Sequence, residues 1–222
     1  MEITDLKKIG KSVKYKVFVD NLFWCILIDE TIVKFNLKKG VNYDADFLNN
    51  AKAEGQKKLA LNTAMKLVSL YSKTKKEIGD YLNKKSFSQE AVKYAIKKLQ
   101  EYNYINDENY AKNYINMKKS VKGKKAIEFE LKNKGINLDI IKKSINEMEN
   151  QDEEIFKLAE KFLRNKKDKS GNIKNQEVES LNNAKQQQNN EFILKGKLFN
   201  HLMGKGFEYD EIMRVINKIF EK

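Results

Sequence analysis

The stretch LKNKGINLDII, residues 131–141, decides the fold of this chain. Leu131 closes one amphipathic pattern, and Gly135 tolerates the positive φ of a helix C-cap at no steric cost. Asn137 is a good N-cap for a second helix, in which apolar residues recur at helical spacing from Ile141 onward. The stretch therefore predicts two helices joined by a tight turn.

The same pattern occurs twice more, as LNKKSFSQEAV at 82–92 and LMGKGFEYDEI at 202–212. The three copies align without gaps, so that Lys85, Lys134 and Lys205 occupy one position. Apolar, cationic and acidic positions match together, which indicates tandem helical units that bury their apolar faces against one another.

The composition points to a polyanionic or acidic partner, since 44 Lys and Arg against 31 Asp and Glu give a net charge of +13. Compositional drift is the alternative, because Lys and Asn are abundant throughout, and both readings stay open. The absence of proline suits long helices.

Cys25 and His201 are the only cysteine and histidine. They exclude a disulfide framework and an ordinary zinc site, and one unpaired thiol fits a reducing, cytoplasmic setting. The apolar run 22–28 is too short to cross a membrane, and the N-terminus does not read as a signal peptide.

Residues 1–43 predict a small antiparallel sheet. Lys14–Val19 alternates polar and apolar residues, and Asp20-Asn21 is a plausible hairpin turn. The further expected strands are Leu22–Ile28, with Phe23 and Trp24 in the sheet core, then Ile32–Leu37, and Ile3–Ile9 at an edge.

Helix signals begin at Asp44. A long pattern with a weak point at Gly55 runs to about Tyr71. Two further helices are marked by the expected capping box Thr74–Glu77 and by an N-cap at Ser88, the second of these helices reaching about Tyr102.

The central repeat starts at Asn106-Asp107, and a basic link around Gly123 follows its first helix. In the last repeat Asp152 is the expected N-cap. The segment 168–190, rich in Asn, Gln and Ser, predicts a mobile loop or a solvated extension of its flanking helices. The residues expected to face inward are Tyr110, Ala111, Tyr114 and Met117, then Ile155, Phe156, Ala159, Phe162 and Leu163.

The motifs of the central repeat resemble the RecX family of RecA regulators. They are DENYA at 107–111, then Gly123, then IxxELxxKGI at 127–136. The third repeat's LxxxLxxKGF at 198–207 is similar to the family's corresponding step, with Lys205 where Arg is usual. Ser86 in place of Gly and the insertion 168–190 depart from the family pattern.

The resemblance implies a mainly α fold of three tandem three-helix repeats in a curved array, here preceded by the small antiparallel β-sheet. The expected divisions are the β region 1–43 and helical repeats 44–106, 107–150 and 151–222, the last with the insertion 168–190.

The resemblance also implies a function without catalysis. Members of the family bind the RecA nucleoprotein filament and restrain its ATP hydrolysis, strand exchange and coprotease activity in recombination, DNA repair and the SOS response. They also bind single- and double-stranded DNA. For this chain we expect a cytoplasmic monomer with no cofactor, no metal and no membrane contact.

Lysines are the candidate contacts, because a lysine is a point charge suited to phosphates and not to reading bases. Any single lysine is as well explained by a solvated surface, but the turn lysines recur at one structural position. The candidates for filament and DNA binding are Lys85, Lys118, Lys119, Lys122, Lys124, Lys125, Lys132, Lys134, Lys142, Lys143 and Lys205.

Two other functions stay open. One is a sequence-nonspecific helix-turn-helix DNA-binding protein, and the other is a protein-binding helical array without a nucleic-acid role. Tyrosines 102, 104, 110 and 114 lie beside lysines and could stack on bases, although Tyr110 and Tyr114 also suit a helix core. Gly10-Lys11-Ser12 lacks the preceding glycine of a phosphate-binding loop, which argues against a nucleotide site.

Overall fold

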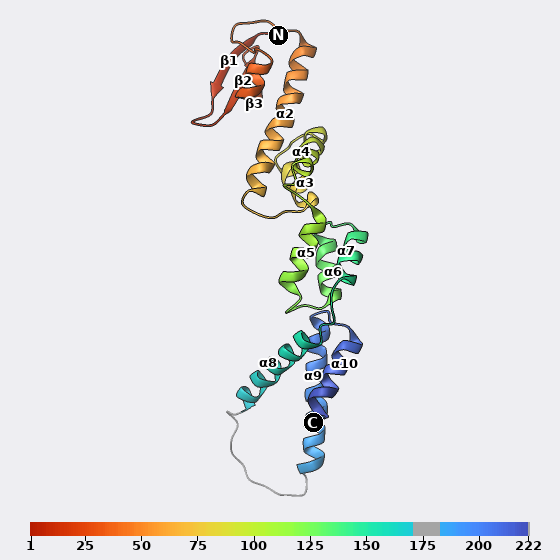
Figure 1. Ribbon diagram of the computed structural model, residues 1–222. Helices are drawn as coiled ribbons and strands as arrows, with labels where there is room; N and C mark the ends of the chain where they lie inside the picture. Colours follow the sequence, from red (N-terminus) through yellow and green to blue (C-terminus); the bar gives the residue numbers. More distant parts are fainter. Residues whose placement is uncertain (171–182, 222) are drawn as a thin grey trace. The chain divides into compact units, whose positions relative to one another are not determined.

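The computed structural model describes residues 1–170 and 183–221, and it is mainly helical with one small antiparallel sheet (Figure 1). The chain divides into two compact units, Met1–Tyr110 and Ala111–Lys222. The elements in chain order are β1 (Ile3–Lys8), β2 (Lys14–Val19), β3 (Leu22–Ile28), α1 (Asp29–Lys34), α2 (Ala45–Val68), α3 (Lys75–Lys84), α4 (Gln89–Glu101), α5 (Asp107–Lys118), α6 (Lys124–Asn133), α7 (Leu138–Asn146), α8 (Asp152–Ser170), α9 (Asn183–Gly204) and α10 (Tyr209–Phe220).

The sheet has the order β1-β2-β3, with both neighbouring pairs antiparallel. Asp20 and Asn21 join β2 to β3 with φ of 48° and 66°, the left-handed pair that a two-residue hairpin turn requires. The expected strands Lys14–Val19 and Leu22–Ile28, the turn at Asp20-Asn21 and the edge strand from Ile3 are confirmed, and the edge strand ends at Lys8, one residue earlier than expected.

The expected strand Ile32–Leu37 is wrong, because the chain forms the short helix α1 there. Ile28 is its extended N-cap, and Asp29 and Glu30 occupy the first turn, where the helix dipole favours acids. Ile32 and Phe35, three residues apart, both pack on the sheet core. Helical spacing, and not alternation, therefore governs these apolar residues.

Phe23 was expected in the sheet core and is instead 57% exposed. The register shifts between Val17 and Phe18, so that Val17 pairs with Cys25 and Phe18 with Phe23, leaving Trp24 as the extra residue of a β-bulge. Trp24 packs against the core, as expected. The bulge places Cys25 and Phe23 on opposite faces although they lie two residues apart.

Helix α2 continues through Gly55, which is a point of close approach and not a break. A Cβ on Gly55 would lie 2.3 Å from Leu27 Cδ2. The first half of α2 contributes Leu48 to the core beneath the sheet, and its second half contributes Ala60 to a separate core with α3 and α4. One helix thus serves two cores.

The caps of α2, α3 and α4 agree with the sequence. The Asp44 carboxylate accepts from the amides of Asp46 and Phe47. Thr74 and Glu77 form the capping box of α3, and Ser88 caps α4. These local hydrogen bonds satisfy amides that have no partner within the helix.

In α5 the apolar face differs from the expected one at a single position. Ala111 is buried and Tyr110 and Tyr114 are half-buried, but Met117 is 63% exposed. Ile115 is buried in its place. Ala111 and Ile115 are four residues apart, so they share one face, whereas Met117 lies two residues further round the helix.

The three aligned turns adopt one conformation, with φ of 60° at Ser86, 76° at Gly135 and 81° at Gly206. The expected positive φ of Gly135 is confirmed. The amide of Ile136 donates to Leu131 O over 3.2 Å, as that of Phe87 does to Leu82 O over 3.3 Å, which closes the helix end with a Schellman-type bond.

In the last repeat the N-cap prediction at Asp152 is one residue late. Gln151 O accepts from the amide of Ile155, and Asp152 is the first residue of α8. Its carboxylate pairs instead with the Arg214 guanidinium of α10 at 3.1 Å. The expected inward residues of α8 all join the core formed with α9 and α10.

Helix covers both ends of the segment 168–190, since α8 reaches Ser170 and α9 starts at Asn183. These ends are extensions of the flanking helices, one of the two alternatives expected. Residues 171–182 lie outside the described residues.

Candidate functional site

A tyrosine and a glutamate join the first two helices of the central repeat. Tyr114 of α5 donates its hydroxyl hydrogen to Glu130 Oε2 of α6 at 2.7 Å. Lys122, from the link between the helices, forms an ion pair with the other carboxylate oxygen of Glu130. Both Tyr114 and Glu130 are half-buried, so the contact fixes their orientation.

Two further lysines converge on the same ring. Lys118 Nζ lies 6.0 Å from the Tyr114 ring centroid, and Lys134 Nζ lies 5.6 Å from it. We call these five side chains the Tyr114 cluster: Tyr114, Lys118, Lys122, Glu130 and Lys134. Three cations against one carboxylate leave an excess of positive charge on this part of the surface.

The charges of the cluster act on Glu130. Burial would raise the pKa of this carboxyl, but the hydrogen bonds from Lys122 and Tyr114 and the charge of Lys118 bring it below its ordinary value. Glu130 is therefore a carboxylate at neutral pH. It holds the tyrosine and Lys122 in place.

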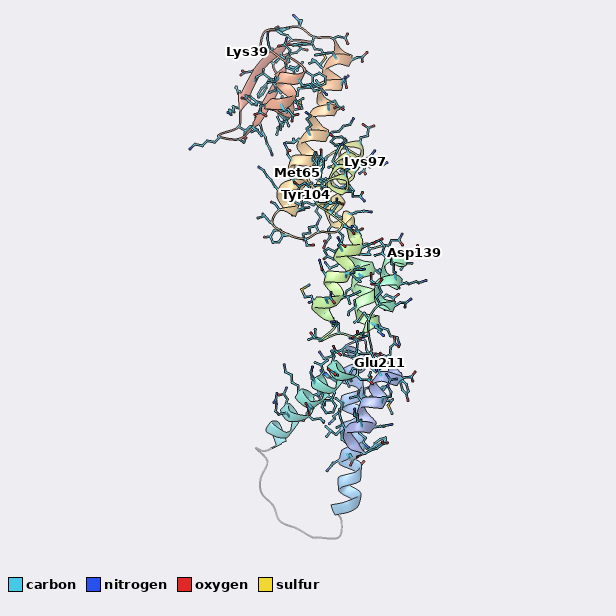
Figure 2. All side chains as sticks on the ribbon, viewed as in Figure 1. Lys39, Met65, Lys97, Tyr104, Asp139 and Glu211 are labelled. Carbon is cyan, nitrogen blue, oxygen red and sulfur yellow. The ribbon has the colours of Figure 1, made fainter. Side chains whose placement is uncertain are left out.

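Two candidate lysines of α6 have a different role. Lys125 Nζ lies 2.8 Å from Glu208 Oε2, and Lys124 Nζ lies 3.7 Å from Glu211 Oε1, both acids belonging to the third repeat (Figure 2 labels Glu211). These ion pairs bind the start of α6 to the start of α10. Lys124 and Lys125 thus help to join α6 to α10.

The turn of the third repeat reinforces this junction through its backbone. The amide of Gly123 donates to Lys205 O at 3.0 Å, and that of Lys125 donates to Gly206 O at 3.1 Å. The turn carbonyls thereby cap the first amides of α6, which would otherwise lack partners. The backbone of Lys205 is part of the fold, and its side chain is half-buried.

The remaining candidates are dispersed. Lys132 pairs with Glu128 one helical turn away at 2.6 Å, and Lys85, in the other unit, lies 5.1 Å from the Tyr81 ring centroid. Lys119 is exposed, and its carbonyl accepts from Gln151 Nε2 at 2.8 Å. Lys142 and Lys143 of α7 are exposed, with no ion pair to any described residue.

The structure therefore gathers three of the eleven candidates in the Tyr114 cluster, two of them on the ring and Lys122 on the Glu130 carboxylate. Three others pair with acids outside the cluster. Sequence reasoning missed Glu130 and Glu208 as their partners. Glu130 could have been found from its place in the motif, but Glu208 lies in another repeat, and only the fold brings it near.

Other residues singled out in the sequence are at the surface. Tyr102 and Tyr104 are exposed and meet edge to face at 6.2 Å. The ring of His201 lies 4.9 Å from that of Phe162, and burial and the charge of Lys205 lower the pKa of this histidine.

None of the helices in the described part of the chain has the length and apolar character that crossing a bilayer needs.

Comparison with known families gives a match over the central repeat. Residues 106–145 match the family described as RecX, second three-helix domain. This range contains all five residues of the Tyr114 cluster. Four of them lie in helices or a helix cap, and Lys122 lies in the link between α5 and α6.

Relatives that match most of the chain carry the name "Regulatory protein RecX". The protein from Caldanaerobacter subterraneus subsp. tengcongensis is 35% identical over 169 residues, which cover 72% of this chain and 84% of that protein. The protein from Clostridium perfringens strain SM101 is 29% identical over 221 residues, covering 98% and 96%. That from Bacillus subtilis strain 168 is 29% identical over 210 residues, covering 93% and 72%.

Two solved structures share the fold. A crystal structure of regulatory protein RecX superposes with a TM-score of 0.66 over 96% of this chain and 98% of that chain, at 21% identity. A crystal structure of RecX from Lactobacillus salivarius gives 0.60 over 75% and 98%, at 26% identity. By sequence and by fold, the chain belongs to the RecX family of regulatory proteins.

Proposed function

We propose that this chain is a non-enzymatic regulator that binds the RecA nucleoprotein filament and DNA. In this proposal it acts as a cytoplasmic monomer and restrains RecA's ATP hydrolysis, strand exchange and coprotease activity. Family membership supports the regulatory role, and the names of the relatives point to the same kind of protein.

The observation that carries the proposal is the Tyr114 cluster. Its lysines are oriented by a ring and a carboxylate, so less side-chain entropy is lost when they meet an anion. Lysine ammonium groups attract phosphates and carboxylates alike, and a RecA filament presents both kinds of anion. The contact would be independent of sequence and sensitive to salt.

The surroundings add to this face. Lys119 follows the cluster at the end of α5, and Lys142 and Lys143 are exposed on α7 of the same repeat. Because Lys124 and Lys125 join α6 to α10 and Lys132 pairs with Glu128 on its own helix, we expect them to contribute less than Lys118 and Lys134. Lys85 and Lys205 remain candidates at the aligned turns.

The test is RecA's DNA-dependent ATPase, measured with a sub-stoichiometric amount of the protein. One variant carries Glu at positions 118, 119, 142 and 143. Its matched control carries Glu in place of the exposed lysines 66, 84, 93 and 97, which changes the net charge equally. Exposed charges contribute little to stability, and Lys118 is the one half-buried lysine among the eight, so circular dichroism of both variants checks that the fold is kept.

We expect the first variant to lose most of its inhibition and the control to retain it. Equal inhibition by both would reject the face formed by Lys118, Lys119, Lys142 and Lys143 as the contact. The helix-turn-helix alternative makes a different prediction: the parent protein would bind DNA in a salt-dependent way but leave the RecA ATPase unchanged.

A further inference from the structure

The N-terminal sheet has an outer face defined by its register. On β2, Val17 pairs with Leu6 and Cys25, and this row packs into the core with α2. Successive residues of a strand point to opposite faces, so the neighbours Lys16 and Phe18 project from the outer face.

The outer face combines aromatic rings with lysines. Phe18 pairs with Phe23 on β3, and the two rings meet edge to face at 6.0 Å. Lys7, the partner of Lys16, places its Nζ 5.2 Å from the Phe18 ring centroid. The side chain of Phe23 is 57% exposed, so one ring is open to solvent.

Positive charge dominates this face. Lys7 and Lys39 both approach the Asp5 carboxylate, at 3.4 and 3.3 Å, and Figure 2 labels Lys39 beside the sheet. Lys16 is exposed. Lys7, Lys16 and Lys39 therefore share this face with the two rings, and Asp5 supplies a carboxylate beside Lys7 and Lys39.

We propose that this outer face binds single-stranded nucleic acid, with a base stacked on Phe23 and with phosphates held by Lys7, Lys16 and Lys39. An exposed ring beside cations is the arrangement by which single strands are held without regard to sequence. The rings accept any base because every base has an aromatic face.

Charge complementarity selects this occupant over a second copy of the chain. Two identical faces would bring equal sets of lysines together and repel each other. Two aromatic side chains are also a small apolar area compared with the roughly 800 Å² that each partner buries in a stable protein interface. A flexible polyanion requires neither self-complementarity nor a large flat contact.

The inference rests on the DNA-binding part of the proposed function and adds a site on the other unit. The test uses the full chain and a fluorescein-labelled oligo-dT, followed by anisotropy. Phe23→Ala removes the exposed ring, and it should weaken binding at least about fivefold, the lower end of the contribution of one stacked base. Phe23→Tyr keeps a ring and should restore the affinity.

Leu22→Ala is the matched control. Leu22 is 74% exposed on the same hairpin, but it pairs with Val19 of the inner row. The affinity of this variant should stay within about twofold of the parent. Changing both Lys7 and Lys16 to Gln should weaken the salt dependence. The negative slope of log affinity against log salt concentration should become shallower by up to about 1.4.

The outcomes separate the two proposals. If the parent binds oligo-dT and Phe23→Ala binds equally well, the outer face is rejected while the proposed function stands. If Phe23→Ala instead abolishes a concentration-dependent dimer in sedimentation, the face is a protein interface and the inference is wrong. If the parent binds no oligo-dT but inhibits RecA, the inference and the DNA half of the proposed function both fail, and the filament half survives.

Discussion

Gly123 and Gly206 lie in backbone contact: a Cβ on Gly123 would stand 2.1 Å from the carbonyl oxygen of Gly206. In return, a Cβ on Gly206 would lie 2.5 Å from the backbone nitrogen of Ala126. Neither neighbour is the free end of a side chain, so neither clash can be relieved by a rotamer change. The junction between α6 and the third turn requires glycine on both sides.

Gly123→Ala should therefore destabilise the protein by about 2–4 kcal/mol, since the backbone has to move. Urea unfolding followed by circular dichroism measures the change. Gly196→Ala is the control, because nothing lies within 4 Å of its Cβ position in helix α9. There we expect a gain of about 0.5–1 kcal/mol from helix propensity. Equal effects of both changes would contradict the close contact.

The shared turn conformation predicts one destabilising and one stabilising substitution. Gly135→Val should cost on the order of 1–2 kcal/mol or more, because φ is 76° there and β-branched residues resist that region. Ser86, with φ of 60°, already bears such strain, so Ser86→Gly should stabilise by up to about 1 kcal/mol. Thermal melts of the two variants report both signs, and a loss of stability in Ser86→Gly would count against the shared turn.

The lowered pKa of Glu130 predicts how its contribution depends on pH. Its ion pair adds stability at pH values above the ordinary value of 4.5, and this stability is lost as the pH falls through the lowered value. Between pH 5 and pH 3 the melting temperature of the parent should fall more than that of Glu130→Gln. The comparison variant is Glu153→Gln, whose parent side chain is 89% exposed. It should follow the parent curve.

Cys25 should be unreactive while the protein is folded. Burial raises the pKa of this thiol from 9.0 to about 12, which reduces the thiolate fraction at pH 8 roughly a thousandfold. Mass spectrometry after iodoacetamide treatment should find the native protein unmodified under conditions that modify the urea-unfolded chain. Rapid modification of the native protein would show that the sheet core opens readily.

Local signals predicted the fold where a few adjacent residues determine it. The capping box at Thr74 and the turn at Gly135 depend on hydrogen bonds within one or two helical turns, and both were expected. The bulge at Trp24 could not be expected in this way, because it is a property of the pairing between two strands. That one extra residue is why Phe23 faces solvent.

The candidate site was predictable in outline, since the lysines of the central repeat are visible in the sequence. The sequence did not predict which of these lysines pair with acids and which lie beside Tyr114. Lys125 and Lys134 are both lysines near one end of α6, and the sequence alone does not distinguish them. In the structure Lys125 pairs with Glu208 near the start of α10, whereas Lys134 lies beside Tyr114. Contacts between residues far apart in the sequence decide which charges remain available to a partner.

Helix α2 sets a limit on where the chain can be cut. Its Leu48 is covered by the strands and its Ala60 by α3 and α4, and Gly55 between them fits closely against Leu27. A chain shortened to begin at Asp44 would lose the strands that cover Leu48 and would expose the first half of the helix to water. The sheet and the first helical bundle therefore form a single cooperative folding unit, and heat should melt them in one transition.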